Sequence, residues 1–309
     1  MIWSTLFNPS LDIVYTLPEL RRGSTCRDCD CRLVPAGKGL TVALVVQALG
    51  EEVCIAGLLP EYERKRFTTM LDANGISHFL FSIPGDMPVT TTIKERENDT
   101  GTRLAAVPSV VPGRLQHEFS EYAARHMAAG DFWCFSGPLP GGFSDDGFND
   151  LIGICAGRGG EALLDTSGIS LQKGIRSRPA IVKPNLNELE EFFGEQIRGV
   201  HHIALKGKRL LDMGIAYVFI SLGADGMIAL HKNDCILCSA PAVEVKETAG
   251  CGDALVAGVL VARKRRFSFT ETCRMAVACG SARAACGGPG ILRPDMVWQL
   301  MEDVRITSV

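Results

Sequence analysis

Three absences in the 309-residue sequence each exclude a class of protein. No long hydrophobic run is present: the most apolar stretch, residues 254–262, is far shorter than the roughly 20 residues of a membrane-spanning helix. Neither sign of charge dominates, since 32 basic and 35 acidic residues give −3 and thus no electrostatic case for nucleic acid. The absence of a short repeat excludes collagen-like and coiled-coil chains. We expect neither a membrane nor nucleic acid as a partner.

The N-terminal segment also lacks the features of a signal peptide. Residues 1–12 contain no basic leader and no long apolar core before Asn8-Pro9. We therefore expect a cytoplasmic protein whose 12 cysteines are reduced thiols, many of them in apolar stretches. Cys26, Cys29 and Cys31 form a cluster, but no second Cys-x-x-Cys and no suitably spaced histidine pair completes a metal site. Structural thiols are favoured there.

What the sequence contains is typical of a folded globular protein, with 46% hydrophobic and 22% charged residues. From about residue 36 onward, short β-branched or aromatic runs alternate with longer segments of helical period. This alternation predicts an α/β fold in which helices cover both faces of a mostly parallel sheet. The predicted strands are 2–7, 53–57, 131–136, 161–165, 180–183, 216–221 and 227–231. The predicted helices are 39–49, 61–74, 112–128, 145–156, 186–193, 200–213, 252–263 and 270–286.

Two stretches, 12–34 and 89–107, break the alternation. They consist of extended pieces and turn residues with no helix between them, and we predict that they pair as a small antiparallel sheet. Such a flap can cover a ligand at the carboxyl ends of the parallel strands, where open α/β sheets bind ligands. No linker is long enough to separate two domains, so we expect one domain over residues 1–309 with this flap as its lid.

The strongest chemical signal is the sequence Gly250-Cys251-Gly252-Asp253 at the start of a predicted helix. Glycines there let successive backbone N–H groups converge on one point, and the positive end of the helix dipole faces the same way. Such a turn can stabilise the charge of a transferring phosphoryl group, and Asp253 could accept the proton of an attacking hydroxyl. The alternative is a tight strand–helix turn in which Asp253 is only an N-terminal helix charge.

Three further segments accompany this turn. Gly37-Lys38-Gly39 precedes a helix and offers backbone donors beside a cation. Asn185 and Glu188 follow a strand, where an amide and a carboxylate suit a hydrated Mg²⁺ and its phosphates; the alternative is a helix-capping box. Residues 221–226 end another strand. The alternative to a functional role for them is an ordinary Asp-Gly turn.

These segments keep one order along nearly the whole chain. They are Asn8-Pro9-Ser10-Leu11-Asp12, Pro35-Ala36-Gly37-Lys38-Gly39, Phe135-Ser136-Gly137-Pro138-Leu139-Pro140, Leu164-Asp165-Thr166-Ser167-Gly168, Lys183-Pro184-Asn185, Ser221-Leu222-Gly223, Thr248-Ala249-Gly250-Cys251-Gly252-Asp253 and Ala278-Cys279-Gly280-Ser281-Ala282. Any one of them is common, but the series in register is specific. It resembles the PfkB, or ribokinase-like, carbohydrate kinases, and most closely the phosphosugar branch that includes 1-phosphofructokinase and tagatose-6-phosphate kinase.

The resemblance implies a ribokinase-like three-layer α/β/α sandwich with a small β-sheet lid, dimeric through the lids. It implies Mg²⁺-dependent transfer of the γ-phosphoryl group of ATP to a sugar hydroxyl. Small molecules, ATP and a sugar phosphate, are therefore the expected partners besides a second copy of the chain.

The resemblance also assigns roles to single residues. Asp253 matches the catalytic base, and Gly250, Cys251 and Gly252 match the anion hole, with cysteine in place of the usual alanine. Matching positions that contact the sugar are Asp12, Gly37, Lys38 and Ser136. Matching positions at the nucleotide are Asn185, Ser221, Gly223, Thr248 and, beside adenine, Gly280. Glu188 and Asp165 match acidic residues that organise the water shell of the metal.

Two departures from the family pattern concern the substrate. Thr41 replaces the usual asparagine after the Gly-Lys-Gly segment. Thr90 aligns with an arginine that clamps the phosphate of the substrate, and threonine cannot replace the charge or the fork of a guanidinium. Four other cations are candidates for holding the substrate phosphate in place of that arginine: Lys94, Lys38, Arg27 and Arg103. Of these, Arg103 is interpreted as a solvated lid charge.

The first hypothesis is an ATP-dependent kinase of a ketohexose phosphate, with fructose 1-phosphate giving fructose 1,6-bisphosphate. The second keeps the enzyme class but takes an unphosphorylated sugar or a nucleoside, for which Thr41 and Thr90 leave room. The third is a non-catalytic sensor of sugar phosphates or nucleotides, against which the intact Asp253 argues, because a binder has no use for a base.

Overall fold

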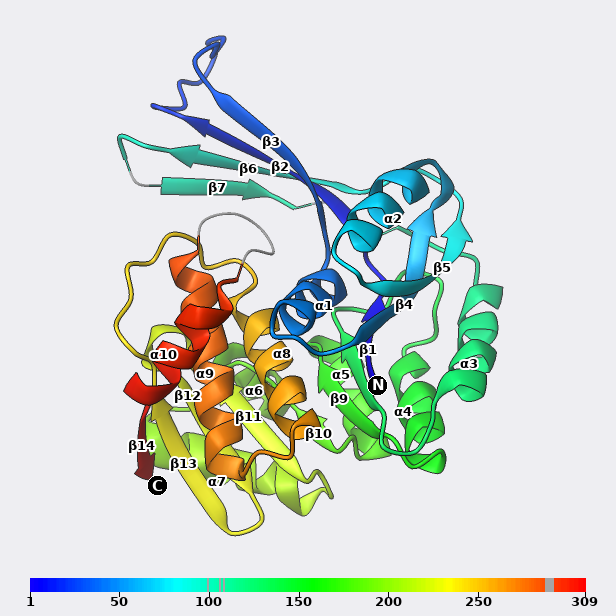
Figure 1. Ribbon diagram of the computed structural model, residues 1–309, viewed down its shortest axis with the longest axis vertical. Coiled ribbons are helices and arrows are strands. Elements are labelled where there is room, and N and C mark those ends of the chain that lie inside the picture. The colour runs from blue at the N-terminus through cyan, green and yellow to red at the C-terminus, as the bar shows by residue number, and fades with distance from the viewer. Residues whose placement is uncertain (99, 106, 108, 287–291) are drawn as a thin grey trace.

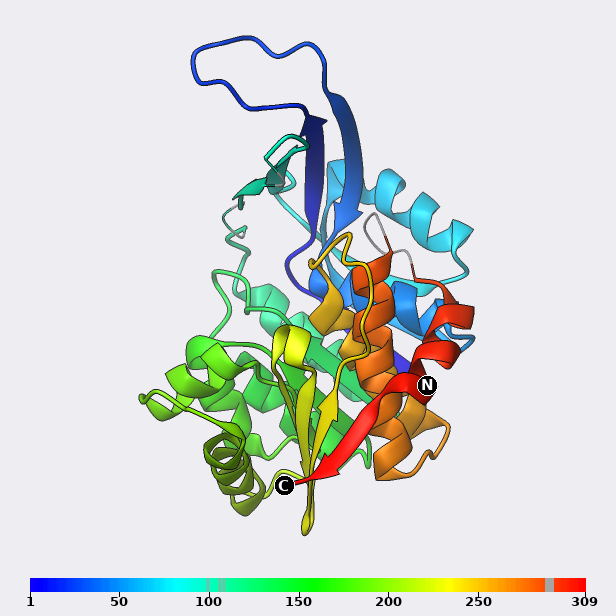
Figure 2. The ribbon, with the colours of Figure 1, turned by 90° about the vertical axis from the view of Figure 1, so that its left-hand side faces the viewer.

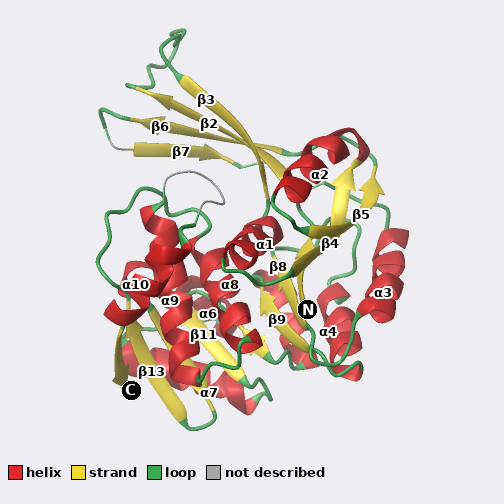
Figure 3. Cartoon of the chain, viewed as in Figure 1, coloured by secondary structure: helices red, strands yellow, loops and turns green. Residues whose placement is uncertain are grey.

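The computed structural model describes residues 1–98, 100–105, 107, 109–286 and 292–309. These residues form a large sheet covered by helices and a smaller sheet that projects from it (Figures 1 and 3). The large sheet has the strand order β14-β13-β12-β11-β10-β9-β8-β1-β4-β5, and the small one β3-β2-β6-β7. The predicted α/β fold with a lid is confirmed. In the part of the chain described, no helix is both long and apolar enough to span a bilayer.

The large sheet is parallel from β5 to β11 and ends in an antiparallel extension. Its order reverses beside β1, which has β4 on one side and β8 on the other. Open α/β sheets bind ligands at the carboxyl ends of strands near such a point. The strands are β1 Ile2–Leu6, β4 Val53–Pro60, β5 Ser77–Ile83, β8 Phe132–Ser136, β9 Glu161–Asp165, β10 Ile181–Val182, β11 Tyr217–Ser221, β12 Met227–His231, β13 Asp234–Ser239 and β14 Arg305–Ser308.

Helices cover both faces of this sheet and bury a hydrophobic core on each. One face carries α1 Lys38–Ala48, α2 Arg64–Ala73, α8 Cys251–Lys264, α9 Phe269–Ala285 and α10 Pro294–Asp303; the other carries α3 Arg114–His126, α4 Gly147–Gly157, α5 Gly168–Gly174, α6 Leu186–Phe193 and α7 Val200–Asp212. The apolar stretch of the sequence lies in α8, whose residues from Asp253 to Ala262 are all buried, as expected for a helix that is apolar all round. Gly258 lets α8 approach α9, because a Cβ there would stand 2.9 Å from the Cα of Ala276.

The lid is the smaller sheet, made of β2 Ser10–Leu17, β3 Asp30–Ala36, β6 Val89–Glu95 and β7 Thr100–Leu104. It stands away from the main body, with the loop of residues 18–29 at its far end (Figure 2). The prediction of an antiparallel sheet was wrong for the central pair, because β2 and β6 run parallel. These strands continue from β1 and β5, which point the same way in the large sheet, so they leave its edge in one direction.

The remaining differences from prediction lie at the edges of the fold. The predicted strands and helices are present with bounds within about three residues, and residues 61–63 form a 3₁₀ turn before α2. Strands β5, β13 and β14 and helices α5 and α10 were not predicted. Strands β5 and β14 are the two edges of the large sheet, and β5 mixes exposed and buried residues. A half-exposed strand therefore lacks the continuous apolar run by which the buried strands were recognised.

Candidate active site

A cavity of about 1060 Å³ lies at the carboxyl ends of the parallel strands, between the large sheet and the lid. Its walls come from β1, the starts of α1 and α8, the ends of β9 to β11, the last turns of α9, and the lid. Of the residues predicted for the site, those that line it are Asp12, Gly37, Lys38, Thr41, Ser136, Asp165, Asn185, Glu188, Ser221, Gly223, Thr248, Gly250, Cys251, Gly252, Asp253 and Gly280. A cavity of this size can hold a nucleotide beside a small acceptor.

The turn that opens α8 forms one wall of the cavity. Gly250 is the N-cap residue and has φ 81°, a left-handed conformation that strongly favours glycine. The first N–H groups of a helix have no intrahelical acceptor and, with the helix dipole, attract anions. A Cβ on Gly252 would stand 3.9 Å from Nζ of Lys183, so a buried cation lies beside these groups. The turn therefore has the properties of an anion site.

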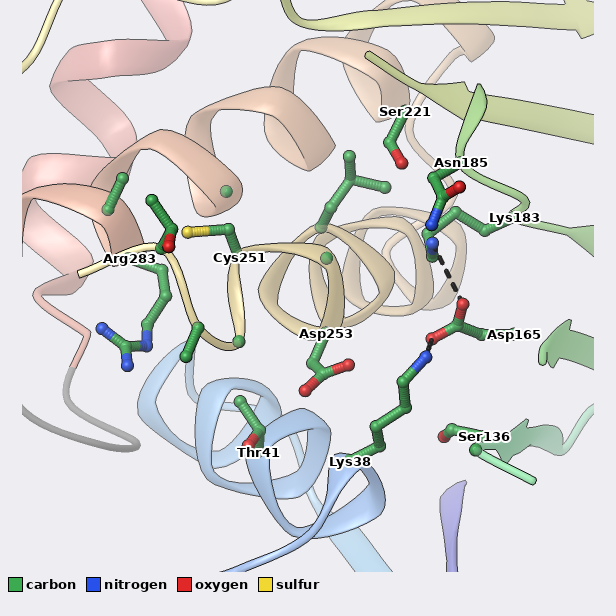
Figure 4. A pocket seen from close by; sticks show the side chains of 18 of the residues that line it. Lys38, Thr41, Ser136, Asp165, Lys183, Asn185, Ser221, Cys251, Asp253 and Arg283 are labelled. Atoms are coloured by element: carbon green, nitrogen blue, oxygen red, sulfur yellow. Dashed lines mark hydrogen bonds and ion pairs between the residues drawn. The ribbon is translucent and has the colours of Figure 1, made fainter. Parts of the chain in front are cut away.

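Asp253 follows this turn and is 9% exposed (Figure 4). Burial raises the pKa of its carboxyl group to about 6, against the opposing effect of the nearby Lys38. Such a carboxylate is ionised near neutral pH yet basic enough to accept a proton, which suits a general base.

A buried chain of charges crosses the floor of the cavity. Asp165, at the end of β9, pairs with Nζ of Lys183 at 3.0 Å and with Nζ of Lys38 at 3.2 Å (Figure 4). Burial alone would raise the pKa of Asp165, but Lys183 and then Lys38 hold it below its usual range. Burial likewise opposes the charge of Lys38, and the carboxylates of Asp165, Asp253 and Glu188 outweigh it and raise its pKa. Lys38 is thus held in its charged form, and Lys183 lies against the same carboxylate.

Two glycines place Lys38 in this chain. Gly37 caps α1 with φ 142°, and a Cβ on Gly39 would stand only 1.9 Å from the carbonyl oxygen of Thr5. The start of α1 therefore lies directly against the end of β1, where Ser4 Oγ donates to the carbonyl of Gly39 at 2.8 Å. The two glycines of the Gly-Lys-Gly segment therefore allow α1 to pack against β1, and this packing directs the side chain of Lys38 into the cavity.

Asn185 and Glu188 form the capping box that the sequence left as an alternative. Oδ1 of Asn185 accepts the N–H of Glu188, and Oε2 of Glu188 accepts the N–H of Asn185, each at 2.8 Å. No group of three carboxylate, histidine or cysteine side chains within the described residues could hold a metal. This donor set fits a Mg²⁺ that keeps several waters and takes its other ligands from phosphates, with Glu188 as the available carboxylate. Asp165 fits less well, because both its oxygens face lysines.

The lid contributes two charged residues to the cavity. Asp12 on β2 accepts from Ser10 Oγ at 3.0 Å, and Nη2 of Arg103 on β7 lies 3.6 Å from its Oδ2. Arg103, interpreted from sequence as a solvated charge, lines the cavity while 54% of its side chain stays exposed. Two other predicted residues do not line it: Arg27 is exposed in the loop 18–29, and Lys94 pairs with Glu247.

Sequence reasoning assigned no role to two buried cations in the cavity wall, Lys183 and Arg283. Lys183 directly follows the strand β10 and begins the Lys-Pro-Asn segment, and its place just after a strand was the available signal. Arg283 lies in the last turn of α9, where the signal is a single arginine in a run of small residues.

Comparison with known proteins identifies the family. Residues 7–296 match the sequence profile of the pfkB family carbohydrate kinases. The chain belongs to this family. It is 28% identical over 304 residues to 1-phosphofructokinase of Haemophilus influenzae, which covers 98% of this chain and 96% of that protein.

Solved structures confirm the ribokinase-like fold. Phosphofructokinase-2 of Escherichia coli in complex with substrates and products has a TM-score of 0.92 to this chain, at 20% identity, over 98% of this chain and 99% of that one. The tetrameric inhibited form of the same enzyme has a TM-score of 0.88, at 20% identity, over 98% of both chains. Membership of the pfkB family makes this protein an ATP-dependent carbohydrate kinase.

Proposed function

We propose that this pfkB kinase transfers the γ-phosphoryl group of ATP to a hydroxyl of a ketohexose phosphate, with fructose 1-phosphate as substrate and fructose 1,6-bisphosphate as product. The observation that carries the proposal is the placement of a buried carboxylate, Asp253, directly after an anion-binding turn. That turn lies in a cavity whose opposite wall contains the lid residues Asp12 and Arg103.

Each part of the site has a task in this reaction. Asp253 takes the proton of the acceptor hydroxyl. At the same time the oxygen of that hydroxyl bonds to the γ-phosphorus, and the bond between the γ-phosphorus and the bridging β-phosphate oxygen breaks, which releases ADP. The N–H groups of the turn and Lys183 stabilise the charge on the moving group. Asn185, Ser221, Gly223, Thr248 and Gly280 form the side of the cavity proposed for the nucleotide. Mg²⁺ bound with ATP would supply further positive charge, with Glu188 holding it through water.

Arg103 supports a phosphorylated acceptor. On the lid, Asp12 pairs in register with Thr90, and Thr92 with Arg103, so Arg103 projects from the same lid face as Asp12. A guanidinium there can donate two hydrogen bonds to a phosphate, the task for which Thr90 is unsuited. The second candidate, a kinase of an unphosphorylated sugar or a nucleoside, is favoured by Thr90 and Thr41 alone.

The test of the base is Asp253→Asn. We expect the variant to keep its melting temperature and its affinity for ATP, but to lose about 10²–10⁴-fold in turnover, because an amide cannot take the proton. Asp225→Asn is the matched control, since Asp225 lies in a nearby turn but does not line the cavity. Near-normal turnover of Asp253→Asn would contradict the assignment.

We further propose a homodimer formed through the lids. The lid face opposite Asp12 and Arg103 carries Leu33, Val89 and Leu104, which are 46%, 44% and 59% exposed. Leu33 pairs with Ile13 and Leu104 with Thr91, which places these side chains in one row across the sheet. A second copy of the chain would cover this row, and the related Escherichia coli enzyme forms a tetramer in its inhibited state.

A further inference from the structure

Arg283 is a buried cation with few partners. Its side chain is 2% exposed, and Nη1 donates to the carbonyl of Cys286 at 3.0 Å. Nε has no hydrogen-bond partner, and no carboxylate within the described residues pairs with the guanidinium. Burying an ionised group without an anionic partner costs several kcal/mol, so such a group calls for a reason beyond packing.

The guanidinium lies against the anion-binding turn. A Cβ on Gly250 would stand 3.4 Å from Nε and 3.9 Å from Nη2 of Arg283, so the planar group packs on the left-handed glycine of the turn. The neighbouring carbonyl of Ala284 accepts the N–H groups of Lys246 and Glu247 at 2.8 and 3.1 Å. The last turn of α9 therefore contacts both residues 246–247, which lead into the turn, and Gly250 of the turn itself.

The other cations of the cavity are already matched by a carboxylate, whereas Arg283 is not. Lys38 and Lys183 share Asp165, so part of their charge is cancelled where they stand. Arg283 lines the same cavity as Gly250 and Gly252 with no such compensation within the described residues. Its uncancelled charge therefore acts on whatever anionic group occupies the turn.

We infer that Arg283 is a positioning residue for phosphoryl transfer: its guanidinium fixes the turn 250–252 from behind and supplies a permanent positive charge at the site of the transferred group. The inference rests on the proposed role of Asp253 as base, and it does not depend on which sugar is the acceptor. Because the residue is preorganised by packing, it acts without rearrangement during the reaction.

The charge also acts on Asp253. The charges that act on the pKa of this carboxylate are those of Lys38 from α1, Asp165 from β9, Lys183 after β10 and Arg283 from α9. Burial raises the pKa of Asp253 and Asp165 adds to the rise, whereas Lys38, Lys183 and Arg283 oppose it. Removing the charge of Arg283 would therefore raise this pKa, so that a higher pH is needed to form the base.

The test compares Arg283→Met with Arg283→Lys, using the sugar that the wild-type enzyme turns over fastest. We expect the Met variant to lose at least about tenfold in kcat with KM for the sugar within about threefold, and its acid limb of kcat/KM to move to higher pH. The Lys variant keeps the charge and should retain both kcat within about threefold and the wild-type acid limb. Arg274→Met is the matched control. Arg274 also lies on α9 and donates to backbone carbonyls, those of Met301 and Val304, but it lies outside the cavity.

A folded Met variant with kcat within about twofold of wild type and an unmoved acid limb would overturn the inference, as would a folded Lys variant as impaired as Met. If the Met variant does not fold, a folded Lys variant that loses more than about threefold in kcat, or whose acid limb moves to higher pH, overturns the inference, and one that stays within these limits supports it. Failure of the proposed base has a different signature: Asp253→Asn would stay active, while the comparison of kcat between the Met and Lys variants would still measure the effect of Arg283.

Discussion

At the scale of single residues, the site depends on charges held in fixed states. Asp165 pairs with two lysines at the floor of the cavity and helps to raise the pKa of Lys38, while burial raises the pKa of Asp253. In the proposed reaction, a carboxylate with a raised pKa accepts the proton of the acceptor while Lys38, whose pKa is also raised, keeps its charge. Arg103 extends the same logic to the acceptor, because a guanidinium stays charged at any physiological pH.

We predict that Arg103→Met raises KM for fructose 1-phosphate by about 10–100-fold with little change in kcat, because charge-assisted hydrogen bonds to the substrate phosphate are lost. Steady-state kinetics on the purified enzyme would measure this. Arg96→Met is the matched control: Arg96 is also a lid arginine, but it pairs with Asp30 and lies outside the cavity. Equal effects of the two substitutions would count against a phosphate contact at Arg103.

Sequence reasoning assigned no role to Lys183 and Arg283, and it named Arg103 as a candidate but interpreted it as a solvated charge. The three residues enter the cavity from separate elements, β7, the end of β10 and α9, which only the fold brings together. The turn 250–253 and the Gly-Lys-Gly segment could be found because their chemistry is local, in glycines beside a charged residue. For Arg103, the decisive fact is that β7 lies next to β6 with Arg103 opposite Thr92, and only the sheet register shows this.

At the scale of elements, the cavity depends on how closely α1 approaches β1. Gly39 makes the approach possible, since its missing side chain leaves room for the carbonyl of Thr5. Because Lys38 is the preceding residue, the same contact fixes the base of the side chain that reaches Asp165. The start of α1 therefore both packs against β1 and positions Lys38 at the site.

We predict that Gly39→Ala destabilises the protein by about 3 kcal/mol or more, because a methyl group 1.9 Å from a backbone oxygen forces α1 away from the sheet. Gly153→Ala is the matched control. Gly153 lies inside α4 with open space around it, so the substitution should stabilise by about 0.5–1 kcal/mol. Urea unfolding of the two variants would measure both values, and a Gly39→Ala variant as stable as wild type would refute the packing argument.

The sequence predicted the buried elements better than the exposed ones. Strands β9 and β12 and helix α6 have the predicted bounds, because each is marked by an apolar run or a helical period between clear stops. The edge strand β5 carries alternating exposed residues and was missed. The parallel pairing of β2 with β6 could not be read from either segment, since it follows from where two distant strands leave the large sheet.

At the scale of the whole molecule, the lid contacts the segment that leads into the anion-binding turn 250–252. Lys94 on β6 forms an ion pair with Glu247, which lies just before the turn 248–253. The inner face of the lid thus contacts the body at the site, while its outer face presents Leu33, Val89 and Leu104 to solvent. The two faces suit two tasks, closing the cavity and joining a second chain.

We predict that the wild-type protein runs as a dimer of about twice the 33.3 kDa chain mass, and that Leu33→Asp combined with Leu104→Asp yields monomers. Two buried carboxylates would make the apolar lid–lid contact unfavourable. Light scattering after size-exclusion chromatography measures the mass. Leu205→Asp, a substitution of another exposed leucine on α7, should leave the dimer intact, and a wild-type monomer would rule out this assembly.

The most direct measurement is ADP release from Mg²⁺-ATP against a panel of fructose 1-phosphate, fructose 6-phosphate, tagatose 6-phosphate, fructose, ribose and adenosine. The account predicts that fructose 1-phosphate gives the highest kcat/KM. Free fructose should be at least about 100-fold poorer, since it lacks the charged group that Arg103 would hold. Turnover confined to the unphosphorylated acceptors would contradict the account, and would mean that Thr41 and Thr90 mark a different class of substrate.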